Sequence, residues 1–120
     1  MAEFAAGWTL DVHASPEWIF LVLCRNGAAI DLTPPLAEHA WRIAEQHSVH
    51  QLVLEFGSNV DLTSHLVGQI VLLHKRLCQN GGKLRLCGLP RDNYEVLQVM
   101  NVAQRFPNYR TREDAVLGLA

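Results

Sequence analysis

Short runs of apolar residues alternate along this chain with longer segments in which apolar residues recur every three or four positions. Residues 8–13, WTLDVH, alternate between apolar and polar side chains and predict a strand. Residues 18–24, WIFLVLC, and 50–56, HQLVLEF, are nearly continuous apolar runs, which is typical of strands buried on both faces. Residues 83–89, KLRLCGL, predict a fourth strand. These four segments supply the predicted sheet.

The segment 33–49, TPPLAEHAWRIAEQHSV, predicts the first helix. Thr33 is suited to the N-cap, and Pro34 to the first helical position, where the missing N–H is not needed. Trp41 falls at the edge of the apolar stripe of this helix. We therefore expect Trp41 to serve packing while half exposed, with a role in self-association as the alternative.

Residues 64–79 predict a second helix, and the following Asn-Gly-Gly at 80–82 is typical of a left-handed helix end. Residues 90–100, PRDNYEVLQVM, predict a third helix with Asp92 as its N-cap. Asn101 follows this helix and is predicted to have a left-handed backbone conformation. The chain then contains a short extended piece at 106–109 and a final helix within 112–120.

The order of these elements is β-β-α-β-α-β-α-(β)-α, and we find no linker, repeat or low-complexity tract. The pattern predicts one α/β domain over residues 1–120, with a mixed, mostly parallel sheet of four to five strands and about four helices. Sites in such sheets gather at the carboxyl ends of the strands. The loops 25–31 and 57–64 both lie at such ends.

The composition narrows the classes of function. Hydrophobic residues make up 49% of the 120 residues, and no apolar run reaches the roughly 18 residues that a membrane span needs. The formal net charge of −2 argues against a nucleic-acid binder. The three cysteines follow no CxxC pattern and predict buried thiols in a reducing compartment. The start, MAEFAAGWTLDV, is no signal peptide, so we expect a cytoplasmic protein without direct membrane insertion.

No set of residues predicts enzyme chemistry, a metal or a cofactor. His47 and His50 are three positions apart, but the first ends a helix, the second begins a strand, and no cysteine or carboxylate completes a ligand set. Ser64 and His65 are adjacent on a helix, where side chains point about 100° apart, so the imidazole is badly placed to activate the hydroxyl. We expect a protein that is not an enzyme.

Three stretches resemble one known family. Residues 53–77, VLEFGSNVDLTSHLVGQIVLLHKRL, are followed by GGKLRLCGL at 81–89 and EVLQVMNVAQRF at 95–106. Together they are similar to the STAS domain, the fold of anti-sigma factor antagonists, over nearly the whole chain. The family carries Asp-Ser-Ser-Gly-Leu-Gly at the start of a helix, and its second serine is the usual phosphoacceptor.

The chain departs from that motif at the phosphoacceptor. Without a gap, the Asp of the family falls on Thr63, its first Ser on Ser64 and its second Ser on His65, while Gly68 keeps its place. A two-residue shift would restore Asp61 and put Thr63 at the acceptor, but it needs an insertion that neither flank requires. The resemblance implies that phosphorylation at the usual site is lost. Thr63 or Ser64 then serves as a helix cap, with phosphorylation of either as the alternative.

The resemblance also implies a protein partner, a serine kinase anti-sigma factor in bacterial transcription or signalling control. In this family the start and one face of this helix dock the kinase. The corresponding positions here are Asp61, His65, Gln69, Leu72 and Arg76. The lone Leu72 among polar residues would suit a protein contact with a small apolar centre.

Two other functions stay open. One is a STAS subunit of a lipid-transport or other transporter ATPase assembly, because such subunits also carry altered motifs. The other is a small-molecule or nucleotide sensor, with Arg25, Asn26 and Asp31 in a ligand loop. The sequence also leaves a homodimer open.

Overall fold

The computed structural model describes residues 3–26, 33–57 and 60–118. The strands found there are β1 (Glu3–Ala5), β2 (Trp8–Ala14), β3 (Ile19–Arg25), β4 (Gln51–Phe56), β5 (Lys83–Cys87) and β6 (Asn108–Tyr109). The α-helices are α1 (Leu36–His47), α2 (Ser64–Gln79), α3 (Arg91–Val99) and α4 (Arg112–Leu117), with a 3-10 turn at Ala103–Arg105.

The strands form one sheet in the order β1-β2-β3-β4-β5-β6. The β1–β2 and β2–β3 pairings are antiparallel, and the β3–β4, β4–β5 and β5–β6 pairings are parallel. A mixed, mostly parallel α/β sheet with four helices is therefore confirmed. The predicted count of four to five strands is wrong, because the sheet in the described residues has six strands.

The strand missing from the prediction is β1. It is three residues long and pairs with β2 through a tight turn in which Gly7 has φ +79°. Glycine adopts positive φ without the steric cost of a Cβ atom, which makes such a turn feasible. Three residues are too few to show an alternating pattern, so the sequence carries almost no signal for this edge strand.

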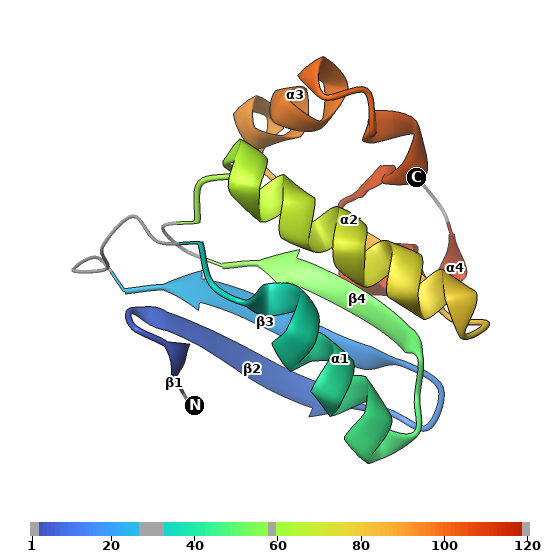
Figure 1. Ribbon diagram of the computed structural model, residues 1–120. Helices are drawn as coiled ribbons and strands as arrows, with labels where there is room; N and C mark the ends of the chain where they lie inside the picture. Colours follow the sequence, from blue (N-terminus) through green and yellow to red (C-terminus); the bar gives the residue numbers. More distant parts are fainter. Residues whose placement is uncertain (1–2, 27–32, 58–59, 119–120) are drawn as a thin grey trace.

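Helices cover the two faces of the sheet unequally (Figure 1). α1 and α2 lie side by side on one face, and α3 continues this layer beyond α2 (Figure 1). The spacing along residues 64–79 predicts an apolar stripe of Leu66, Val67, Ile70, Leu73 and Leu77, with Val71 and Cys78 at its edges. The first five are confirmed as core, whereas Cys78 is exposed, contrary to the buried thiol expected of it. The stripe packs with the inward-facing residues of β3 and β4 in the main core.

The opposite face carries a small second core under α4. Its buried residues are Trp18, Val53, Cys87, Tyr109 and Ala115. Arg85 Nη1 donates to the carbonyl oxygen of Ala115 over 2.6 Å, near the end of α4. Arg112 on α4 forms an ion pair with Glu55 on β4, with 2.6 Å between Nη2 and Oε2. These two arginines attach α4 to the sheet.

The ends of α2 are as predicted, and the two glycines that follow it are required for different steric reasons. Gly81 has φ +75°, which favours glycine. Gly82 approaches the backbone of His50 so closely that an added Cβ would collide with the carbonyl oxygen of that residue. Asn101 also has a positive φ, +59°, as predicted for the residue after α3.

Two predicted helix starts are wrong. α1 begins at Leu36 with Pro35 as its N-cap, and Thr33 lies outside the helix. Pro35 has no side-chain acceptor, and the Oε1 atom of Gln69 on α2 instead accepts the Ala37 N–H over 3.0 Å. A contact from a neighbouring helix thus replaces the local cap that the sequence pattern predicts.

The third helix shows the same kind of error. α3 has Pro90 as its N-cap, and Asp92 lies inside the first turn. An acidic residue in this turn still favours the helix, because it faces the positive end of the helix dipole.

Candidate functional site

The start of α2 is built around Thr63. Its extended backbone and its Oγ1 atom, which accepts the Leu66 N–H over 3.1 Å, make it the N-cap. The expected capping role is confirmed for Thr63. Ser64 and His65 are exposed in the first turn, and their backbone N–H groups have no acceptor within the described residues.

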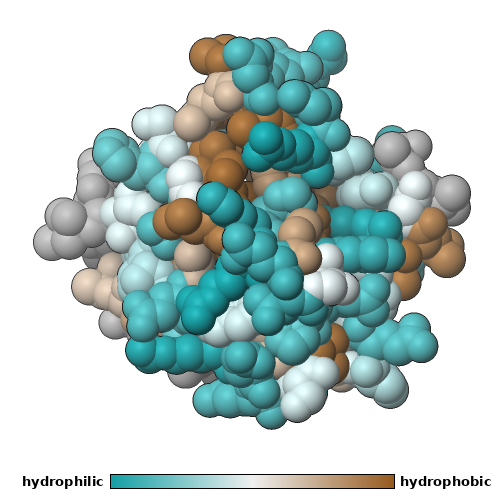
Figure 2. Space-filling model, turned by 45° about the vertical axis from the view of Figure 1, so that its right-hand side comes forward, coloured by the Kyte–Doolittle hydropathy of each residue, from teal (hydrophilic) through white to brown (hydrophobic). Residues whose placement is uncertain are grey.

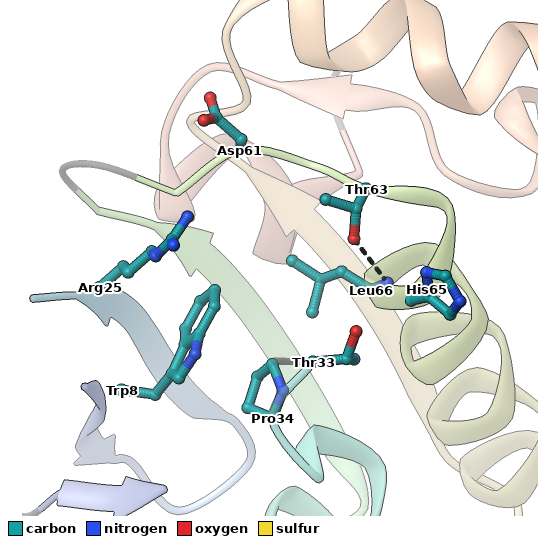
Figure 3. Close-up of a pocket in the computed structure, with 8 residues that line it drawn as sticks. All are labelled: Trp8, Arg25, Thr33, Pro34, Asp61, Thr63, His65 and Leu66. Carbon is teal, nitrogen blue, oxygen red and sulfur yellow. Dashed lines mark hydrogen bonds between the residues drawn. The ribbon is translucent and has the colours of Figure 1, made fainter. Parts of the chain in front are cut away.

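A pocket lies beside this helix start at the carboxyl end of β3 (Figure 3). Its volume is about 260 Å³. Four separate segments of the chain contribute its lining residues, which are Trp8, Arg25, Thr33, Pro34, Asp61, Thr63, His65 and Leu66. The fold thus brings together candidates from the two loops that the sequence singled out.

Not every residue of the expected ligand loop can be placed. Arg25 lines the pocket, and its guanidinium carbon lies 5.6 Å from the centre of the Trp8 ring. The backbone N–H of Asn26 donates to the carbonyl oxygen of Gly7 over 2.7 Å. Asp31 lies outside the described residues, so the prediction for it stays a prediction.

The sequence did not single out Trp8 for this pocket. Its side chain is 95% buried, and its indole nitrogen, Nε1, has no hydrogen-bond partner among the described residues. Buried indole N–H groups usually find a partner. The alternating pattern of residues 8–13 indicated that Trp8 faces inward, but not which loops would meet it.

The five residues predicted to contact a partner lie on or before α2. His65 and Arg76 are exposed, Leu72 is 57% exposed, and Asp61 is exposed ahead of the helix. Gln69 differs, because it is half-buried and its Oε1 atom is already bonded to α1. Gln69 therefore stabilises the contact between α2 and the start of α1.

A shallow groove of about 550 Å³ runs between α1 and α2. It is lined by Pro35, Ala37, Glu38, Gln69, Leu72, Lys75, Arg76 and Gln79. Leu72 is the large apolar side chain in this otherwise mostly polar lining. The predicted strip on α2 thus continues onto the neighbouring helix.

Trp41 is not half exposed as expected. It is 8% exposed, and the guanidinium carbon of Arg76 lies 4.4 Å from the centre of its ring. A cation held over an indole face is attracted by the ring electrons, and here it also covers the ring from solvent. The packing of α2 against α1 therefore decides the exposure of Trp41.

Gly68 has no steric reason within the described fold to be a glycine. An added Cβ would meet no heavy atom within 4 Å, and its φ is not positive. Glycine inside a helix is less favourable than alanine by roughly 1 kcal/mol. Gly68 lies four positions before Leu72 and three after His65, so it shares their side of α2.

The face of the molecule in Figure 2 is mostly hydrophilic, with hydrophobic residues in small separate areas. Single exposed apolar side chains are ordinary on such surfaces. Leu72 is one such side chain, 57% exposed, and it lines the groove between α1 and α2.

Two histidines have structural contacts. His39 stacks on Phe4 with 4.7 Å between ring centres, and His74 meets the edge of Phe106 at 4.9 Å. Burial, followed by the charge of Arg42, lowers the pKa of His39. Burial, followed by the charge of Arg105, lowers the pKa of His74. The lowered pKa favours the neutral form of both rings.

Within residues 3–26, 33–57 and 60–118, no three His, Cys, Asp or Glu residues are grouped so that they could hold a metal ion. In the same residues, none of the helices combines the length and the apolarity that crossing a bilayer requires.

The chain is similar in fold to a solved structure. The NMR structure of the protein TM1081 superposes with a TM-score of 0.67 and covers 99% of this chain and 94% of that one. The two sequences are 15% identical, so the match shows a shared fold alone. No family model matches the chain, and no curated protein matches it significantly.

Proposed function

We propose that this protein is a STAS-like interaction module that docks a serine kinase anti-sigma factor through the exposed side of α2. Support for the family comes from the motif resemblance at 53–77 and 81–89, together with the order of strands and helices. The chain acts as an anti-sigma factor antagonist, and capture of the kinase frees a sigma factor.

The observation that carries the proposal is the combination of Gly68 and Leu72 on one exposed side of α2. Leu72 is 57% exposed, and the open space over Gly68 lets another backbone approach the helix closely. His65 and Arg76 flank this centre with polar groups. An apolar centre with a polar rim is the usual anatomy of a protein interface.

In this proposal docking is not switched by phosphorylation at the usual site. His65 occupies the aligned acceptor position, and the Thr63 hydroxyl oxygen accepts the Leu66 N–H as the helix cap. The protein therefore binds its partner constitutively. Phosphopeptide mapping after incubation with the captured kinase is expected to find no phosphate on Thr63 or Ser64, and phosphate on either would contradict constitutive docking.

The first test is affinity capture of the tagged protein from its own cells, with mass spectrometry of the captured proteins. Recovery of a histidine-kinase-like ATPase supports the proposal. Recovery of a membrane transporter ATPase instead would overturn it and favour a subunit of a transport assembly.

Two matched variants test the docking face. Leu72→Asp places a charge at the centre of the face and is expected to abolish capture of the kinase. Leu117→Asp places the same charge on α4, where Leu117 is 68% exposed, and is expected to leave capture unchanged. Equal capture by both variants would show that the partner docks elsewhere.

A further inference from the structure

We infer that the pocket beside the start of α2 binds a small organic carboxylate with an apolar body. Four features support this: the size of the cavity, its apolar walls, a buried donor without a partner, and positive potential at one end. The inference does not rest on the docking proposed for the exposed side of α2, although Asp61 and His65 border both surfaces.

The cavity fits a small ligand. Its volume of about 260 Å³ lies just below the roughly 300–1,000 Å³ of pockets that hold drug-sized molecules. Trp8, Pro34 and Leu66 supply apolar walls, and all three are buried. Figure 3 shows the Leu66 side chain and the Trp8 ring on facing sides of this space. The planar or short branched apolar part of a ligand would contact both the Leu66 side chain and the Trp8 ring.

The donor without a partner is the indole N–H of Trp8. The side chain is 95% buried, and Nε1 finds no acceptor among the described residues. A buried polar group left unpaired costs about 1–3 kcal/mol. In Figure 3 the nitrogen edge of the indole faces Pro34, on the pocket side. An acceptor atom on a ligand would remove this cost.

The charge of the acceptor follows from the other groups around the cavity. The guanidinium of Arg25 lies over the Trp8 ring, and the unbonded N–H groups of Ser64 and His65 mark the positive end of a 16-residue helix. These groups favour an anion. Asp61 also lines the cavity, but its exposed carboxylate points away from Leu66 and Trp8 (Figure 3). A carboxylate is thus the acceptor that the pocket fits best.

The experiment uses benzoate as the probe and the unmodified protein. The three tryptophans give three indole N–H signals in a proton–nitrogen NMR spectrum, assigned with single Trp→Phe variants. Titration with benzoate is expected to move the Trp8 signal saturably and to leave those of Trp18 and Trp41 in place. A Trp8 signal that does not move, or three signals that move alike, would overturn the inference.

Related probes test the chemistry. Benzamide keeps the shape but loses the charge, and benzylamine reverses it. Both are expected to bind at least tenfold more weakly than benzoate, because a hydrogen bond to a charged group is lost or opposed. Equal or tighter binding of benzylamine would show that Asp61 dominates the pocket and would overturn the preference for an anion.

A matched pair of variants tests the donor. Trp8→Phe keeps an aromatic wall but removes the N–H, and is expected to weaken benzoate binding by about tenfold. Trp18→Phe alters the second core on the other face and is expected to leave binding unchanged. If Trp8→Phe does not fold, Arg25→Gln is tested in its place and is also expected to weaken benzoate binding. Unchanged binding in a folded Trp8→Phe or Arg25→Gln protein would contradict the assigned contacts.

Discussion

At the residue scale, adjacent residues of the same chemical type can differ in their hydrogen bonds. Thr63 caps α2, and Ser64 beside it is exposed with its backbone N–H unbonded. The two hydroxyl residues differ because only the N-cap has the extended backbone that turns its oxygen toward the third helical N–H. A difference of one position thus separates a structural hydroxyl from one that faces solvent.

Thr63→Ala is expected to lower the free energy of unfolding by about 1 kcal/mol, because the Leu66 N–H loses its acceptor. Urea unfolding followed by circular dichroism measures this change. Thr63→Ser retains the oxygen and is expected to stay within about 0.5 kcal/mol of the original protein. A Thr63→Ala protein as stable as Thr63→Ser would show that the cap contributes nothing measurable.

Cys87 makes stability depend on pH in the alkaline range. Burial, followed by the charge of Glu55, raises the pKa of the Cys87 thiol from 9.0 to about 12. Above pH 9 the unfolded chain loses this proton while the folded protein keeps it, so the free energy of unfolding falls as pH rises from 9 toward 12. The contribution is fully present below pH 9.

The measurement compares urea unfolding of the original protein and Cys87→Ala between pH 8 and pH 10.5. Other groups titrate in both proteins, so the difference between the two slopes isolates the thiol. The original protein is expected to lose stability more steeply than Cys87→Ala. Parallel slopes would show that the Cys87 thiol ionises equally in the folded and the unfolded protein.

At the scale of elements, α2 connects the core to the surface on which docking is proposed. One side of it is buried against the sheet, and the Gln69 side chain completes the start of α1. Arg76 covers Trp41 from the same helix. The position of α1 therefore depends on α2, and a change at their contact would alter the groove between them.

Gly68→Ala is expected to raise the free energy of unfolding by roughly 0.5–1 kcal/mol, because alanine is the better helix former and its Cβ has open space. Thermal and urea unfolding measure the change. Gly82→Ala is the matched control and is expected to destabilise the protein, because the new Cβ collides with the carbonyl oxygen of His50. Loss of stability in Gly68→Ala would reveal a packing role for this glycine within the fold.

At the scale of the whole molecule, the two faces of the sheet have unequal cores. The side with α1 and α2 holds the large core, while α4 covers a core of five buried residues. α4 is six residues long, well below the roughly 12–15 residues at which isolated helices become marginally stable. Its stability depends on the contacts with Arg85 and Glu55.

The N–H groups of α4 are therefore expected to exchange with solvent faster than those of β3 and β4, because short elements with few buried contacts open locally. Hydrogen exchange followed by NMR measures this order. Arg112→Gln is expected to speed exchange in α4 and leave α2 unchanged. Arg42→Gln breaks an exposed pair with Glu38 and is expected to change neither helix. Equal exchange in α4 and the central strands would contradict the unequal cores.

The sequence by itself determined the elements whose signal is local. The apolar runs specified β3, β4 and β5, and the 3.6-residue period specified the buried stripe of α2. The Asn-Gly-Gly at 80–82 specified where this helix ends. Gly81 and Asn101 were predictable as left-handed residues because the steric limits on backbone angles act within a few residues. The assignment of Thr63 or Ser64 as a cap also followed from sequence, although not which of the two.

Only the tertiary structure decided features that depend on residues far apart in the chain. Gln69 replaces the expected cap of α1 from 32 residues away, and Arg76 covers the tryptophan that was expected to be half exposed. The pocket forms where Trp8, Arg25 and the start of α2 converge. Periodicity shows which side of an element is buried, but the partner across the core is set by how the layers pack.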